Sequence, residues 1–84
     1  MKPIYVFHTR VGPFYICAIR PPGCTEVRYE AVFNDEGYGN YSRPDQAAED
    51  LANNGTFSIM CNGQRLDTSR LGIPASVLQW ERIA

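Results

Sequence analysis

The sequence predicts an α+β domain: an antiparallel sheet of about five strands, covered on one face by a helix at residues 43–53, with a short C-terminal helical element. Three observations lead to this prediction. Apolar and polar residues alternate along residues 27–33, as in a strand with one buried face. Residues 43–53 place a proline in the first turn and small apolar residues at helical spacing. The pair Asn62-Gly63 is a strong signal for a tight hairpin turn.

Length and charge limit the functional classes. The 84 residues, with a mass of 9.5 kDa, fit one domain over residues 1–84 and exclude a deep cleft between two domains. The formal net charge of −1 gives no overall field that would favour nucleic acid, an anionic membrane or an acidic substrate.

The first half of the chain predicts three strands. Residues 4–9 and 14–19 are rich in β-branched and aromatic side chains, and Gly12-Pro13 separates them. The run Pro21-Pro22-Gly23 predicts a loop, because proline has no N–H to donate to a strand ladder. Along residues 27–33 we expect one row of side chains to face the core: Val27, Tyr29, Ala31 and Phe33.

The middle of the chain predicts a turn at residues 34–37, an edge strand or loop at residues 38–41, and then the helix. The Ser42 hydroxyl is expected to cap this helix by accepting the Asp45 N–H. A stripe of small apolar residues would permit close approach to the sheet: Ala47, Ala48, Leu51 and Ala52. Past the last turn, near Asn53, we expect Gly55 to take the position that favours glycine.

The last third predicts a hairpin and a C-terminal helical element. Phe57, Ile59 and Cys61 alternate with polar or flexible residues, and residues 64–66 would form the returning strand. In the tail, Pro74 fits a first helical position and Trp80 falls on an apolar helical stripe. The tail is short enough to form instead one turn of helix followed by a last strand.

Cysteine usage predicts a reducing compartment. The three cysteines form no C-x-x-C pair and one is left over from any pairing, which indicates reduced thiols in a cytoplasmic protein. No stretch has the length or apolarity of a signal peptide or a membrane span. Cys17 and Cys61 are expected in the core, and Cys24 is the most exposed candidate. A zinc site would need these three thiols and His8 to converge, which their spacing does not suggest.

The sequence predicts no enzyme activity, no cofactor and no metal. His8 is the only histidine, Lys2 the only lysine, and no phosphate-binding loop is present. The carboxylates are numerous, but a chain of this size is too small to form a cleft that holds two of them as a catalytic acid and base. We therefore expect them to be solvated, and we assign no catalytic residue.

Charge is unevenly distributed along the chain. Residues 1–28 carry a net charge of +3, residues 29–54 carry −5, and the rest carries +1. The acidic middle contains Tyr38 and Tyr41 in a glycine-rich segment beside the helix. Tyrosine among small polar residues suits protein contacts, so the leading hypothesis is a non-enzymatic protein-binding or regulatory module that uses Tyr38, Tyr41 and Arg43, with self-association as one form of this contact. Alternatively, both rings fold back over the helix and close the core.

Two other functions are weighed beside this one. A weak nucleic-acid binder would use Arg10, Arg20 and Arg28, and residues 28–33 have a passing likeness to an RNA-binding strand in which Tyr29 or Phe33 would stack on bases. The acidic Glu30 on that strand and the missing helix after the first strand count against it. A small thiol enzyme or redox responder would be centred on Cys24.

Three short motifs give the chain a resemblance to other sequences. They are Gly-x-Phe-x-Ile at residues 12–16, Gly-x-Tyr-Ser with Ala-Ala at residues 39–48, and Ile-Pro followed by Trp at residues 73–80. With these motifs the chain resembles small bacterial proteins of unknown function. The resemblance implies a short α+β domain and no particular activity.

Overall fold

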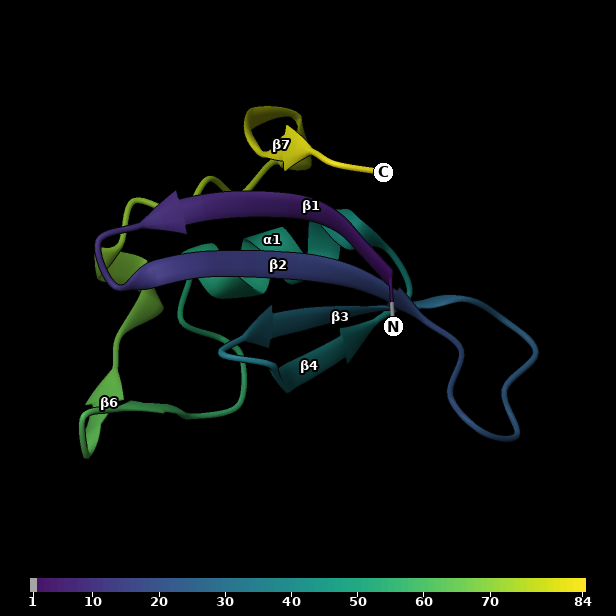
Figure 1. Ribbon diagram of the computed structural model, residues 1–84, viewed down its shortest axis with the longest axis horizontal. Coiled ribbons are helices and arrows are strands. Elements are labelled where there is room, and N and C mark those ends of the chain that lie inside the picture. Colours follow the sequence, from purple (N-terminus) through teal and green to yellow (C-terminus); the bar gives the residue numbers. More distant parts are fainter. Residues whose placement is uncertain (1) are drawn as a thin grey trace.

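The main sheet contains five antiparallel strands in the order β4-β3-β2-β1-β7 (Figure 1). The structure is a computed structural model that describes residues 2–84. The strands are β1 (Lys2–Thr9), β2 (Gly12–Ile19), β3 (Arg28–Phe33), β4 (Glu36–Tyr41) and β7 (Glu81–Arg82). Consecutive strands pair from β1 to β4, and β7 returns to pair with β1, with Tyr5 opposite Arg82. The predicted α+β class is confirmed.

Two tight turns each use two consecutive residues with positive φ. Asn34 and Asp35, with φ of 51° and 64°, join β3 to β4. Asn62 and Gly63, with φ of 54° and 79°, join β5 (Ile59–Cys61) to β6 (Gln64–Leu66). Such turns match the twist of two-residue hairpins. The hairpin predicted at Asn62-Gly63 is confirmed, but β5 and β6 form a two-stranded sheet of their own.

The helix predicted at residues 43–53 is present as α1 (Pro44–Ala52), flanked by Arg43 and Asn53 as its capping residues. The cap predicted at Ser42 is wrong. The Ser42 hydroxyl donates to Gln46 Oε1 at 2.9 Å, and the same oxygen accepts the backbone N–H groups of Ser42 and Arg43. The Gln46 side chain thus reaches back over the first turn and satisfies the donors there.

The helix ends with Asn54 in the left-handed position that was predicted for Gly55. Asn54 has a φ of 57°, and the Gly55 N–H donates to the Asp50 carbonyl at 2.7 Å. Asparagine tolerates this backbone conformation better than most residues. Its side chain is also used, because Asn54 Oδ1 accepts the Thr68 N–H at 3.3 Å.

The core lies between α1 and one face of the sheet, and Figure 1 shows α1 behind β1 and β2. The Phe14 and Phe33 rings stack with their centroids 4.4 Å apart. Buried beside them are residues of both layers: Ile16, Ala31, Ala47, Ala48 and Leu51. The predicted small-residue stripe is confirmed at its three buried members, which let the helix backbone approach the sheet closely.

The predicted core-facing row of residues 27–33 is correct only in part. Ala31 and Phe33 are buried and Tyr29 is half-buried, but Val27 precedes the strand and is 41% exposed. Val32 alternates with the core-facing residues and so lies on the other face of the sheet. It is nevertheless buried, because its cross-strand partner on that face is Tyr15. Alternation therefore predicts the direction of a side chain better than its burial.

The C-terminal helical element is a single turn of 3-10 helix, η2 (Val77–Gln79), followed by β7. Pro74 precedes this turn instead of starting it, and the Ser76 side chain accepts the Leu78 N–H as the cap. Trp80 is 5% exposed, and its indole N–H donates to the Pro74 carbonyl at 3.0 Å. Of the two outcomes that the sequence left open, a turn followed by a last strand is the observed one.

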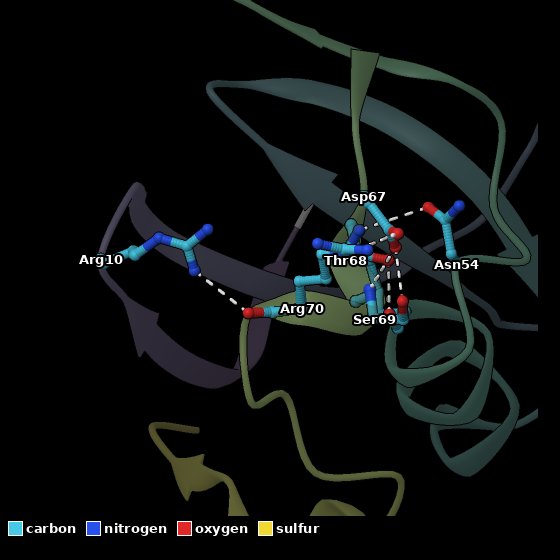
Figure 2. A network of polar contacts seen from close by, with 7 residues as sticks. Arg10, Asn54, Asp67, Thr68, Ser69 and Arg70 are labelled. Atoms are coloured by element: carbon cyan, nitrogen blue, oxygen red, sulfur yellow. Dashed lines mark hydrogen bonds and ion pairs between the residues drawn. The ribbon is translucent and has the colours of Figure 1, made fainter.

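A polar network ties the end of α1 to a second 3-10 turn, η1 (Thr68–Arg70) (Figure 2). The Thr68 hydroxyl is fully buried and donates to the Leu51 carbonyl in the last turn of α1. Arg10, in the turn between β1 and β2, donates to the Arg70 carbonyl at 3.1 Å. These contacts connect segments that lie far apart in the sequence.

No helix within residues 2–84 has both the length and the apolar character needed to cross a membrane.

We expect Thr68→Val to destabilise the fold by about 1–2 kcal/mol, because it removes a buried hydroxyl donor from the Leu51 carbonyl while keeping the side-chain volume. Urea unfolding measures this change. Ser69→Ala is the control: the Ser69 residue is exposed, and its loss should stay within about 0.5 kcal/mol. Equal effects of the two substitutions would contradict the structural role of Thr68.

Candidate functional site

Two hollows adjoin at Tyr41, between the edge strand β4 and α1. The larger, the polar hollow, has a volume of about 450 Å³, and the smaller, the aromatic hollow, about 260 Å³. Asn40, Tyr41 and Asp50 line both. The polar hollow is completed by Arg28, Ser42, Arg43, Gln46 and Glu49. The aromatic hollow is completed by Tyr38, Gly39, Gly55, Thr56 and Phe57.

All three residues predicted as a contact site line this pair of hollows. Tyr38 lies in the aromatic hollow, exposed Arg43 in the polar hollow, and Tyr41 in both. The two tyrosine rings are also half-buried and pack against the core cluster. Part of each ring thus packs against the core, as the alternative interpretation predicts, and part lines the hollows, while the contact role stays a prediction.

Two glycines make room for the polar groups of the aromatic hollow. A Cβ on Gly39 would overlap the Tyr41 hydroxyl, which lies back along the strand over this position. A Cβ on Gly55 would lie 3.2 Å from Asp50 Oδ1. Neither glycine has a positive φ, so both positions use the space that glycine leaves instead of its backbone freedom.

A backbone hydrogen bond holds Phe57 beside the edge strand. The Phe57 N–H donates to the Tyr38 carbonyl at 2.9 Å, where the chain leaves α1 and passes along β4. The Phe57 side chain is nevertheless 75% exposed. The backbone at Phe57 is therefore anchored to the edge strand, while most of the surface of the ring stays accessible.

Carboxylates accompany both tyrosine hydroxyls. The Tyr38 hydroxyl donates to Glu36 Oε2 at 3.0 Å, and burial together with this carboxylate raises the Tyr38 pKa. Burial, followed by the adjacent Asp50 carboxylate, raises the Tyr41 pKa well above its ordinary value. Both phenols are therefore neutral at physiological pH, and the negative charge beside them comes from the carboxylates.

In the polar hollow a charged side chain is tied to the edge strand. Arg28 Nε donates to Asn40 Oδ1 at 2.6 Å, across the β3–β4 pair. The hollow holds two guanidinium groups, Arg28 and Arg43, and two carboxylates, Glu49 and Asp50, so its formal charges balance. Such a surface offers hydrogen bonds of both kinds to a partner.

The cysteines lie apart from this site. Cys17 is buried in β2, where burial, and then the Glu30 carboxylate, raise its pKa and disfavour the reactive thiolate. Cys24 is half-buried, and its thiol donates to the Glu26 carbonyl at 3.4 Å. Among residues 2–84, no three His, Cys, Asp or Glu side chains gather closely enough to hold a metal ion.

The three arginines of the nucleic-acid hypothesis do not share one surface. Arg10 and Arg20 follow opposite ends of the β1–β2 hairpin, separated by the eight residues of β2. A strand of that length spans roughly 25 Å. Arg28 lies near Arg20, because it pairs with Ile19. Phe33 is 1% exposed and stacks on Phe14, which leaves no free face for a base.

Sequence reasoning missed Phe57 and Asp50 as members of the site. Phe57 was expected to lie in a strand of the hairpin, and Asp50 to be one of several solvated carboxylates. Asp50 reaches the hollow because α1 packs beside β4, and Phe57 reaches it because the chain turns back after Asn54 and runs along β4. The two glycines that flank Tyr38, Gly37 and Gly39, were the signal in the sequence that this strand accommodates neighbouring side chains.

We expect Gly39→Ala to destabilise the protein by about 1–3 kcal/mol, because the added methyl group displaces the Tyr41 ring. Urea unfolding of Gly39→Ala, Tyr41→Ala and the double variant measures the coupling between the two positions. The methyl group should cost much less once the Tyr41 ring is absent. An unchanged cost in the double variant would show that the ring is not the obstacle.

The raised Tyr41 pKa predicts a stability loss at high pH. Because the folded-state pKa lies above the unfolded value of 10.0, the neutral phenol contributes stability below about pH 10 that is lost as the pH rises further. Unfolding free energies measured between pH 8 and pH 11 should therefore fall, and Tyr41→Phe should flatten this fall. A decline that is identical in the two proteins would contradict the assignment.

The motifs behind the sequence resemblance lie mostly in the core. Phe14, Ile16, Ile73 and Trp80 are buried, whereas the motif residues Gly39, Tyr41 and Ser42 line the hollows. These positions account for the motifs structurally, and the resemblance itself stays a prediction. No protein-family model, curated protein or solved structure matches the chain.

Proposed function

We propose that this chain is a non-enzymatic protein-binding or regulatory module, and that it contacts its partner through Tyr38, Tyr41 and Arg43. The observation that supports this most directly is the pair of adjoining hollows lined by these three residues, with the accessible Phe57 ring at one end. Aromatic and arginine side chains contribute a large share of the binding energy in protein interfaces.

The composition of the site suits a protein partner. An accessible aromatic ring provides apolar area, and two arginines and two carboxylates provide directional polar contacts around it. The arginines of the nucleic-acid hypothesis lie at two ends of the hairpin, so we favour protein over nucleic acid. A second copy of this chain is one candidate partner, which the sedimentation measurement below tests.

We further propose that the protein works in the reducing cytoplasm. The support is that all three cysteines are free and that one of them, Cys17, is buried in the sheet, where it behaves as a small apolar residue.

Arg43→Ala tests the proposed function, because the Arg43 side chain is exposed and its removal leaves the core intact. The unmodified protein and the variant are immobilised at equal density, and proteins captured from the native cell extract are quantified by mass spectrometry. Sedimentation measures self-association. We expect the variant to capture at least tenfold less of one protein, or to dimerise with at least tenfold lower affinity. A tenfold loss of affinity corresponds to about 1.4 kcal/mol.

Leu78→Ala is the matched control, since Leu78 is 93% exposed and lies outside both hollows. It should retain the partner and the oligomeric state. The variants Tyr38→Ala and Tyr41→Ala extend the test where circular dichroism shows that they fold. If all folded variants capture the same proteins and associate equally, the proposed function is wrong.

A further inference from the structure

We propose that the aromatic hollow binds a cationic side chain, the ammonium group of a lysine or the guanidinium group of an arginine, presented by the protein partner. This inference rests on the proposed function and names the chemistry of its ligand. Three aromatic side chains and one carboxylate line the hollow: Tyr38, Tyr41, Phe57 and Asp50.

The first support is the combination of aromatic rings with negative charge. The face of an aromatic ring attracts a cation, and this attraction strengthens where the cation loses part of its water. Asp50 adds a full negative charge inside the hollow, and Glu36 adds a second one next to the Tyr38 hydroxyl. None of the eight residues that line the hollow is basic, so a bound cation meets no like charge among them.

The second support is the space itself. The hollow measures about 260 Å³, whereas one water occupies about 30 Å³ in the liquid. Gly39 and Gly55 maintain this space, because a side chain at either position would approach the Tyr41 hydroxyl or the Asp50 carboxylate. The Tyr41 hydroxyl and the Asp50 carboxylate therefore have free space beside them, next to the rings.

The third support is the position of Phe57. Its backbone is hydrogen-bonded to the edge strand, yet its ring is 75% exposed. The surface of the Phe57 ring is therefore available to a ligand without a rearrangement of the fold. In the polar hollow next to it, Arg28 and Arg43 balance the carboxylates, whereas the lining of the aromatic hollow carries a net negative charge, so the charge distribution favours a cation at the aromatic end.

Titration of the full chain with single amino-acid amides tests the inference. The probes are N-acetyl-arginine amide and N-acetyl-lysine amide. N-acetyl-citrulline amide is the uncharged control for arginine, and N-acetyl-glutamate amide is the anionic control. Amide resonances of the ¹⁵N-labelled protein report the site. We expect saturable shifts at Gly39, Gly55 and Phe57 with at least one cationic probe, and at least tenfold weaker binding of citrulline and glutamate.

Two substitutions test the roles of the rings and the carboxylate. Phe57→Leu keeps an apolar side chain but removes the aromatic face, and we expect it to weaken cation binding at least threefold. Asp50→Asn should do the same by removing the charge. Leu78→Ala, which lies outside both hollows, should bind the cationic probes like the unmodified protein. Phe57 is so exposed that Phe57→Leu decides the question even if Asp50→Asn does not fold.

The inference is overturned if the cationic probes shift the spectrum no more than the citrulline probe does. It is also overturned if the shifts occur at residues away from the hollow, or if Phe57→Leu leaves the affinity for the cationic probes unchanged. The proposed function fails separately. If Arg43→Ala loses the partner while the cationic probes do not bind, the chain is a protein-binding module whose aromatic hollow takes another side chain. If the probes bind and no variant loses a partner, the wider proposal is wrong.

Discussion

The fold depends on the packing of a short helix against the middle of the sheet. α1 has nine residues, too few to be stable in water by itself, so its stability comes from contact with the sheet. Ala47, Ala48 and Leu51 are completely buried against Phe14, Ile16, Ala31 and Phe33. The two alanines allow a close approach that a larger side chain would prevent, and this contact also brings Asp50 next to the edge strand. The site is thus built by the same packing that holds the domain together.

The edge strand β4 combines two demands that are usually separate. An exposed strand edge is open to pairing with other chains, and here the outward Tyr38 carbonyl is occupied by the Phe57 N–H. The glycines of β4 at the same time make room for neighbouring side chains, with the Glu30 carboxylate over Gly37 and the Tyr41 hydroxyl over Gly39. The strand therefore contributes two half-buried rings to the core and supplies half of the residues that line the aromatic hollow.

Charge acts locally in this molecule. The net charge of −1 hides an acidic middle segment and a basic N-terminal third, and the fold brings parts of both together. Arg28 from β3 meets Asn40 of β4 and lies with Arg43 in the polar hollow, while Asp50 and Glu36 flank the tyrosines. A partner therefore meets a charge-balanced end and a negative end within one surface, which favours orientation over simple electrostatic attraction.

The sequence by itself determined the local structure. Alternation along residues 28–33, the proline and small-residue stripe of α1, and the turn residues Asn62-Gly63 predicted their elements correctly, because each depends on neighbours close in the chain. Tertiary structure decided the rest. Only the folded chain shows that Gln46 caps the helix in place of Ser42 and that β5 and β6 stay outside the main sheet. Tyr38, Tyr41 and Arg43 were predicted as contact residues from local composition. Asp50 joins them because α1 packs beside β4, and Phe57 joins them because the chain reverses at Asn54 and runs along β4; no local pattern encodes these contacts between separate segments.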